Sequence, residues 1–313
     1  MTKPIEDKLS KIPVLNIIVK FFKQIKLPGL EGLSFYDLVE LYVIGILRGA
    51  LTTRASAIAF NFFTALFPFL LFILIVIPVI PIEGFRVEFL NFLNSFLPPS
   101  TSEFFFKNIF DNIDGTQRGG LLSSVFLVSM FLMANGINAV FAGFESSYHE
   151  QLSRNIVKQY LYAFGVALIL AFLLILTVVV LGYFQIYILG NLENYGILGK
   201  ENIQFWIPVA KYVFYVIMVY LATAVLYYFG TREGKESKFF SVGALFTTVL
   251  IILSSYLFGV YINNFSKYND LYGSIGALLI LLFYLWLNSN ILLLGYELNA
   301  SLHRLKKINN NLV

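Results

Sequence analysis

Residues 159–192 read QYLYAFGVALILAFLLILTVVVLGYFQIYILGNL, and no charged side chain interrupts this stretch between Lys158 and Glu193. A helix needs roughly 20 residues to cross the hydrocarbon core of a bilayer, which is about 30 Å thick. Leu, Ile, Val and Phe dominate the stretch, without the alternation of polar and apolar residues that is typical of a membrane barrel. Because lipid offers the backbone no hydrogen-bond partners, a chain in this environment forms a helix. The stretch therefore predicts a membrane-spanning helix.

Five other stretches of the chain, each also 20 or more residues long, are free of charge in the same way. The predicted fold class is therefore all-α, a polytopic membrane protein with six transmembrane helices. The predicted spans lie near residues 55–80, 120–143, 160–187, 205–229, 240–262 and 274–298. Residues 1–54 form a basic N-terminal segment before this bundle (55–300), and residues 301–313 form a short tail after it.

The composition agrees with a membrane protein and excludes several classes of site. Hydrophobic residues make up 58% of the chain and charged residues 13%, whereas a soluble domain carries about 25% charged residues. The chain has no cysteine, so a disulfide scaffold, a thiolate metal site and a cysteine nucleophile are all excluded.

The distribution of Lys and Arg predicts the orientation of the bundle. The N-terminal segment, the second and fourth loops and the tail together carry 16 of these residues, whereas the opposite side carries five. The positive-inside rule then places both termini in the cytoplasm, as an even number of spans requires.

Amphipathic segments flank the predicted spans. Residues 12–25 interleave apolar residues with lysines, which is typical of a basic helix on anionic lipid headgroups or of an ordinary helix packed on the bundle. Residues 34–47 form a second amphipathic stretch. In the first outer loop, residues 81–118, phenylalanines recur at helical spacing before Pro98 and Pro99. We expect two short outer-loop helices, which dip into the membrane or cover the bundle.

No motif for catalysis, a metal or a cofactor is present in the sequence. The only histidines, His149 and His303, have no spaced carboxylate or cysteine partners. Residues 230–237 resemble a phosphate-binding loop but are one residue short of the required spacing. We therefore expect no catalytic residues, no metal, no cofactor and no enzyme activity.

Glu297 is the sharpest polar feature of the predicted spans. Asn290, Glu297 and Arg304 are spaced by seven residues, so they share one stripe of a helix. This stripe is interpreted either as a site for a cationic group or a proton-coupled gate, or as an ion pair of Glu297 with Arg54 or Arg304 that stabilises the bundle.

Uncharged polar residues form a second candidate site. Asn61 and Thr64 precede Pro68 in the first span, and Asn135 and Asn138 lie in the second. A proline permits a kink and frees a backbone carbonyl. These side chains either line a cavity or gate, or hydrogen-bond a neighbouring helix.

Three motifs resemble those of the YihY/BrkB family. Residues 57–68, AIAFNFFTALFP, are similar to its first-helix signature, although Phe60 and Asn61 stand where the family often has two tyrosines. Asn135-Gly-Ile-Asn138 falls at its second-helix motif, and YGSIG and GYELNA in residues 272–300 resemble its last-helix signature. The resemblance covers about residues 40–305.

The resemblance implies a six-helix protein of the bacterial inner membrane. The family once carried a ribonuclease BN label, and some members are linked to serum resistance or envelope lipid export. The residues here do not support a nuclease, which needs clustered carboxylates with metal or a histidine acid–base pair.

Two hypotheses for the function follow. The first is a transporter or flippase-like carrier of a lipid or amphipathic envelope component, whose partners are membrane lipids and not nucleic acid. Its route would be lined by Asn61, Asn135, Asn138, Asn290 and Glu297. The second is a non-transporting scaffold that recruits envelope-biogenesis partners through the basic N-terminal segment.

Overall fold

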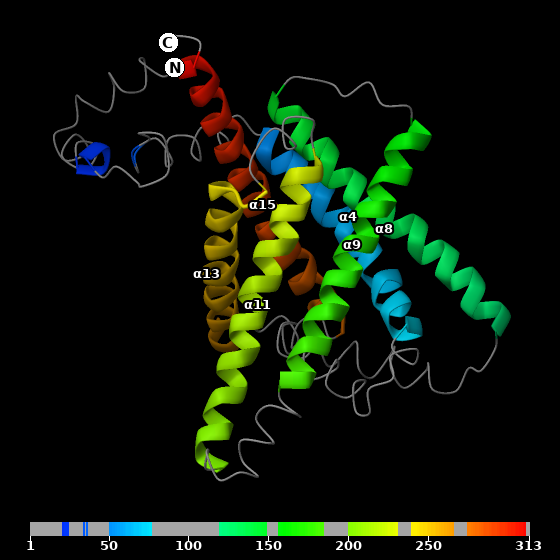
Figure 1. The fold of residues 1–313 in the computed structure, drawn as a ribbon. Coiled ribbons are helices and arrows are strands. Elements are labelled where there is room, and N and C mark those ends of the chain that lie inside the picture. Colours follow the sequence, from blue (N-terminus) through cyan, green and yellow to red (C-terminus); the bar gives the residue numbers. More distant parts are fainter. Residues whose placement is uncertain are drawn as a thin grey trace.

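The described part of the chain is almost wholly helical, as the sequence predicts. The computed structural model describes residues 21–24, 34, 36, 50–76, 119–148, 156–184, 200–230, 239–265 and 274–310. The long helices are α4 (Ala50–Val76), α8 (Gly119–Tyr148), α9 (Ile156–Tyr183), α11 (Lys200–Gly230), α13 (Val242–Phe265) and α15 (Ser274–Asn310) (Figure 1). Residues 21–24 are also helical, and Lys23 lies 4.9 Å from the ring centre of Tyr36 in a cation–π contact.

Five of these helices contain a described stretch that is long and apolar enough to cross a membrane, namely α8, α9, α11, α13 and α15. Large apolar side chains such as Phe172 and Tyr256 are exposed on them, as expected where lipid replaces water as the solvent. Helix α4 has 27 residues, and its role as a sixth span stays a prediction. The two outer-loop helices and most of the two N-terminal amphipathic segments lie outside the described residues.

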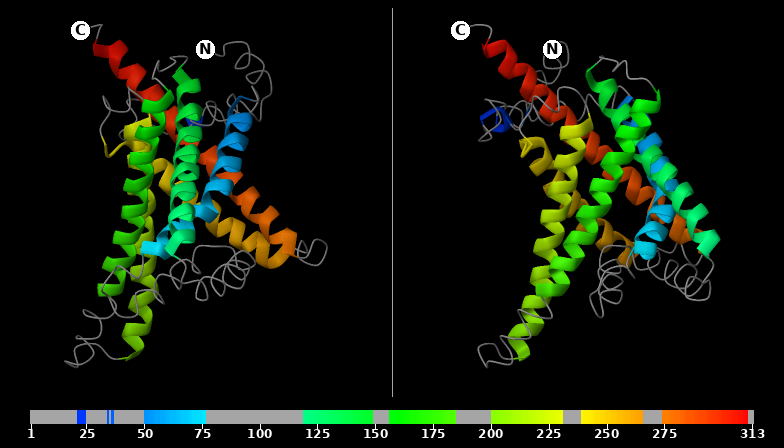
Figure 2. Two further views of the ribbon diagram at one scale, coloured as in Figure 1. Left: turned by 90° about the vertical axis from the view of Figure 1, so that its right-hand side faces the viewer. Right: turned by 45° about the vertical axis from the view of Figure 1, so that its right-hand side comes forward.

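Each helix contacts the next one along the chain, and α15 returns to contact α4. The helices therefore form a closed ring in chain order. Helix α4 begins and α15 ends at the same end of this ring, which we call the proximal end; the opposite end is the distal end (Figures 1 and 2). Toward the distal end, α4 and α8 diverge from α9 and α11, which is clearest in the right-hand view of Figure 2.

Small residues allow the helices to approach one another closely. Along the contact of α4 with α8, an added Cβ at Gly136 would lie 3.2 Å from the Cβ of Ala65, and one at Gly143 would lie 2.8 Å from Ile58. Close packing of this kind holds helices together in lipid, where the hydrophobic effect does not act between them.

The helices extend beyond the predicted spans at one or both ends, and α15 and α4 show the reason. Helix α15 continues to Asn310, through most of the segment predicted as a tail, because Leu298 and Leu302 remain buried and pack against α13. Helix α4 begins at Ala50, within the predicted N-terminal segment, because Leu51 is buried in the core. Arg54 consequently lies in the second turn of a packed helix.

Candidate functional site

A layer of hydrogen-bonded polar side chains joins three helices in the middle of the bundle. The hydroxyl of Tyr160 on α9 donates to Oδ1 of Asn135 on α8 at 3.2 Å, and Nδ2 of Asn135 donates to Oδ1 of Asn61 on α4 at 2.8 Å. Nδ2 of Asn61 donates in turn to the carbonyl of Ala57 at 2.8 Å. The structure thus brings together Asn61 and Asn135 from two predicted spans and uses their amides to connect helices.

The remaining uncharged candidates lie close to this layer. Asn138 accepts a hydrogen bond of 2.7 Å from Nε2 of Gln159, which gives α8 and α9 a second polar link. The Thr64 hydroxyl donates to the Asn61 carbonyl within α4 at 3.0 Å. Pro68 lies inside α4, one turn further along. Tyr160 and Gln159 were not predicted as site residues, although they are polar residues at the start of a long apolar run.

Arg54 and Glu297 form an ion pair near the proximal end. Nη2 of Arg54 lies 2.9 Å from Oε1 of Glu297, and Nη1 donates to the carbonyl of Gly143 at 2.9 Å. The side chains are 17% and 22% exposed, respectively. One guanidinium group therefore connects α4, α15 and α8, which matches the structural interpretation of Glu297. A transport role for Glu297 stays a prediction.

The polar residues of the predicted stripe on α15 have separate contacts. Asn290 donates to the carbonyl of Trp286 on its own helix at 2.8 Å, so this amide group is engaged one turn back rather than with Glu297. Arg304 lies on α15, seven residues beyond Glu297, and the predicted pairing of these two stays a prediction.

An apolar layer separates the ion pair from the polar layer. Ile58 and Leu293 are fully buried there, and both lie against Gly143. Ile58 lies between Arg54 and Asn61 along α4, and a continuous route that joins the predicted residues stays a prediction.

Aromatic side chains add to this apolar layer at the proximal end, and we call the two together the barrier. The rings of Phe144 and Tyr296 stack with a centroid distance of 4.1 Å, and Tyr227 meets Phe144 edge-on at 5.5 Å. The Tyr227 hydroxyl donates to the Leu292 carbonyl at 2.6 Å and so accepts from Thr247 at 2.6 Å. Helices α8, α11, α13 and α15 are thereby held together.

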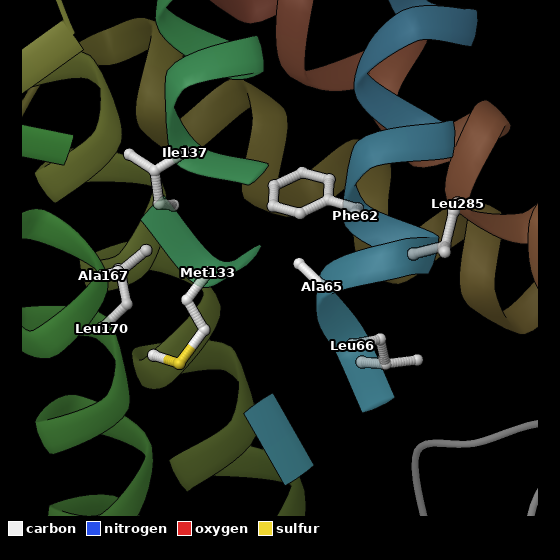
Figure 3. Close-up of a pocket in the computed structure, with 8 residues that line it drawn as sticks. All are labelled: Phe62, Ala65, Leu66, Met133, Ile137, Ala167, Leu170 and Leu285. Carbon is white, nitrogen blue, oxygen red and sulfur yellow. The ribbon is translucent and has the colours of Figure 1, made fainter. Parts of the chain in front are cut away.

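On the distal side of the polar layer lies a cavity of about 290 Å³. In Figure 3, Phe62 extends from α4 toward Ile137 of α8. The lining residues come from four helices and carry no charge: Phe62, Ala65, Leu66, Met133, Ile137, Ala167, Leu170 and Leu285. None of these was predicted, because apolar residues in a membrane span give no local signal of the space between helices.

The arrangement favours binding of an apolar group over acid–base or metal chemistry. Within the part of the chain that the structure describes, no group of three or more His, Cys, Asp or Glu side chains is placed to hold a metal ion. The cavity lining offers hydrocarbon groups and one thioether, which contact apolar ligands through dispersion.

Comparison with known proteins shows that the chain is similar to membrane proteins of bacteria. The profile of the family described as Virulence factor BrkB matches residues 45–311. YfkH of Bacillus subtilis (strain 168), whose name labels it ribonuclease-like, is 26% identical over 260 residues, which cover 82% of this chain and 91% of the relative. A UPF0761 membrane protein of Coxiella burnetii (strain Dugway 5J108-111) is 28% identical over 250 residues, covering 77% of this chain and 84% of the relative.

A shorter match of 31% identity over 106 residues is to UPF0761 membrane protein IL2447 of Idiomarina loihiensis, covering 33% of this chain and 34% of the relative. No solved structure matches the chain. Together with its five described spans, the similarity to named membrane proteins makes the chain a multi-pass membrane protein.

Proposed function

The chain belongs to the Virulence factor BrkB family, and from this premise we propose that it is a transporter or flippase-like carrier of a lipid or amphipathic envelope component. The observation that carries the proposal is the uncharged cavity lined by four helices, α4, α8, α9 and α15. A cavity of about 290 Å³ is roughly twice the size of an engineered apolar cavity of about 150 Å³ that binds benzene. It therefore has room for a substantial apolar group.

The barrier at the proximal end supports a carrier that opens to one side at a time. The cavity lies distal to the polar layer, while Ile58, Leu293 and Phe144 are fully buried on the proximal side. Carriers of this type expose a central site to alternate sides by moving one group of helices against another. The ion pair of Arg54 with Glu297 holds the proximal end closed, and its opening would release the site toward that side.

The proposed setting is the bacterial inner membrane, with six spans and both termini in the cytoplasm. The proximal end would then face the cytoplasm, in agreement with the excess of Lys and Arg there. Because the chain has no cysteine, single cysteines can report the side of the membrane. A cysteine at Ser301 should be protected from a membrane-impermeant maleimide in intact spheroplasts and labelled after lysis; labelling before lysis would contradict this orientation.

We test the carrier itself with purified protein in liposomes of phosphatidylethanolamine and phosphatidylglycerol that contain trace fluorescent lipids. Movement of a fluorescent lipid between leaflets is followed by chemical quenching of the outer leaflet, with protein-free liposomes as the control. A carrier must close the proximal end as well as open it, so Glu297→Gln, which weakens the ion pair, should slow this movement while leaving a folded protein by gel filtration. If the wild-type protein moves no lipid, amphiphilic peptide or glycolipid, the carrier proposal fails. If deletion of residues 1–30 then abolished the protein's function in cells, the result would favour a scaffold, because the scaffold recruits its partners through this basic segment.

Enzyme activity is not part of the proposal, and neither is nucleic acid as a partner. The name of YfkH describes that relative as ribonuclease-like, so the alternative has a direct test. Highly purified protein should leave a labelled RNA intact with and without Mg²⁺ or Mn²⁺. Cleavage that copurifies with the protein and is lost in a point variant would overturn this view.

A further inference from the structure

Two apolar hollows adjoin the same pair of helices. Besides the cavity, an open groove of about 430 Å³ lies between α8 and α9. Its lining residues are Met130, Phe131, Ala134, Val157, Tyr160, Leu161 and Phe164. Phe131, Val157 and Leu161 are each more than 60% exposed, so the groove lies on a surface that faces lipid.

Small and unbranched residues of α8 and α9 lie where the groove and the cavity adjoin. Along α8, Met130 and Ala134 line the groove and Met133 lines the cavity; along α9, Phe164 lines the groove and Ala167 lines the cavity. We call this contact between α8 and α9 the seam. Alanine leaves little side chain there, and methionine is unbranched and adapts its shape readily. A small separation of α8 from α9 would therefore join the two spaces.

We propose that the cavity is a binding site for one hydrocarbon chain of a membrane lipid, which enters from the bilayer through the seam between α8 and α9. The lining residues gain dispersion contacts when a hydrocarbon chain enters the cavity, and the bilayer around the helices supplies such chains at high concentration. The cavity lining carries no charged residue and no side-chain hydrogen-bonding group other than the Met133 thioether. The site therefore selects a chain by its shape, and the headgroup stays outside it.

Polar contacts near the seam are consistent with this assignment. The hydroxyl of Tyr160 and the amide of Asn135 are bonded to each other, and Asn135 is bonded to Asn61. These groups link helices on the proximal side of the cavity, so they bound the site without entering it. The inference rests on the proposed carrier function for its purpose, but the binding itself is measured independently of transport.

The test uses photoactivatable chains. Full-length protein in phosphatidylcholine nanodiscs receives trace phosphatidylglycerol or phosphatidylethanolamine with a diazirine at the middle of one acyl chain. After illumination, adducts are mapped by mass spectrometry. Adducts should appear on Met133 and Phe62, with yields for the two headgroups within about two-fold. Absence of adducts at both residues would overturn the site, and a strong headgroup preference would overturn recognition by the chain alone.

Matched variants separate the cavity from the lipid-facing surface. Leu170→Trp fills the cavity and should lower the Met133 and Phe62 adducts roughly ten-fold, the change expected when about 1.4 kcal/mol of contacts is lost. Leu176→Trp, on the same helix at a position that is 43% exposed, should leave them unchanged. Ala167→Leu is a second blocking variant if Leu170→Trp fails to fold. Equal adduct yields in blocking and control variants would overturn the site.

The entry route has its own readout. Cysteines at Phe131 and Tyr160, whose rings stack with centroids 5.9 Å apart, can be joined by a bifunctional thiol reagent in this cysteine-free chain. Cross-linking before addition of the labelled lipid should lower the cavity adducts relative to the same double-cysteine protein without the reagent. Unchanged adducts after cross-linking would overturn entry between α8 and α9. Cavity adducts without lipid movement in liposomes would leave the site intact and refute the carrier function.

Discussion

Replacing Gly295 by alanine should destabilise the bundle strongly, because three helices meet at this residue. An added Cβ would overlap Oγ1 of Thr247, lie 2.6 Å from the Tyr227 hydroxyl oxygen and lie 2.9 Å from the Gly243 carbonyl oxygen. These distances are too short for a carbon atom, so α15 must move away from α11 and α13. The move also disturbs the hydrogen bonds from Thr247 to Tyr227 and from Tyr227 to Leu292.

The magnitude follows from three contributions. Overpacking of a core costs about 1–3 kcal/mol, and each disturbed hydrogen bond costs about 1 kcal/mol. Alanine in place of glycine recovers roughly 0.5–1 kcal/mol of helix propensity. The free energy of unfolding should therefore fall by about 2–4 kcal/mol.

The assay is reversible unfolding in mixed micelles of increasing SDS fraction, followed by the fluorescence of Trp206 and Trp286. Gly165→Ala and Gly259→Ala are the matched controls, because an added Cβ meets nothing within 4 Å at either position. Both controls should be neutral or gain up to roughly 1 kcal/mol. If Gly295→Ala unfolds at the same SDS fraction as these controls, the close contact of α15 with α13 and α11 is refuted.

Other predictions use the same unfolding assay. Arg54→Leu removes bonds to two helices and should lower the free energy of unfolding by about 2–4 kcal/mol. Glu297→Gln keeps a hydrogen-bond acceptor and should lower it by about 1 kcal/mol. Equal losses in the two variants would contradict the bridging role of the guanidinium. Leucine at Asn61 and Asn135, singly and together, should give a coupling energy of about 0.6 kcal/mol and at most roughly 1.7 kcal/mol, while additive effects would mean that these amides do not interact. Tyr227→Phe removes two hydrogen bonds and should lower the free energy of unfolding by about 1–2 kcal/mol. An unchanged free energy would show that the hydroxyl does not stabilise the bundle.

The sequence alone determined the all-helical class, the approximate position of each long helix and the family. The transfer of a helix from water to lipid depends on composition over about 20 residues, which is local information. The sequence also predicted Arg54 as one of two candidate ion-pair partners of Glu297, because few other charges lie inside the spans and a carboxylate there needs a cation.

Tertiary structure decided which polar and small residues meet. Asn135 lies between Asn61 and Tyr160 only because α8 packs against both α4 and α9, and nothing in the local sequence distinguishes it from an asparagine that faces lipid. The close approach at Gly295 is equally invisible, since Gly259 in the neighbouring helix has open space around it.

The cavity shows the difference most clearly. Its lining residues come from positions 62 to 285 of the chain, and each is an ordinary apolar residue of a membrane span. Whether such residues fill space or leave it empty depends on the divergence of four helices and the volumes of side chains far apart in sequence. Composition therefore determined that this chain enters the membrane, and helix packing alone decided where a ligand has room within it.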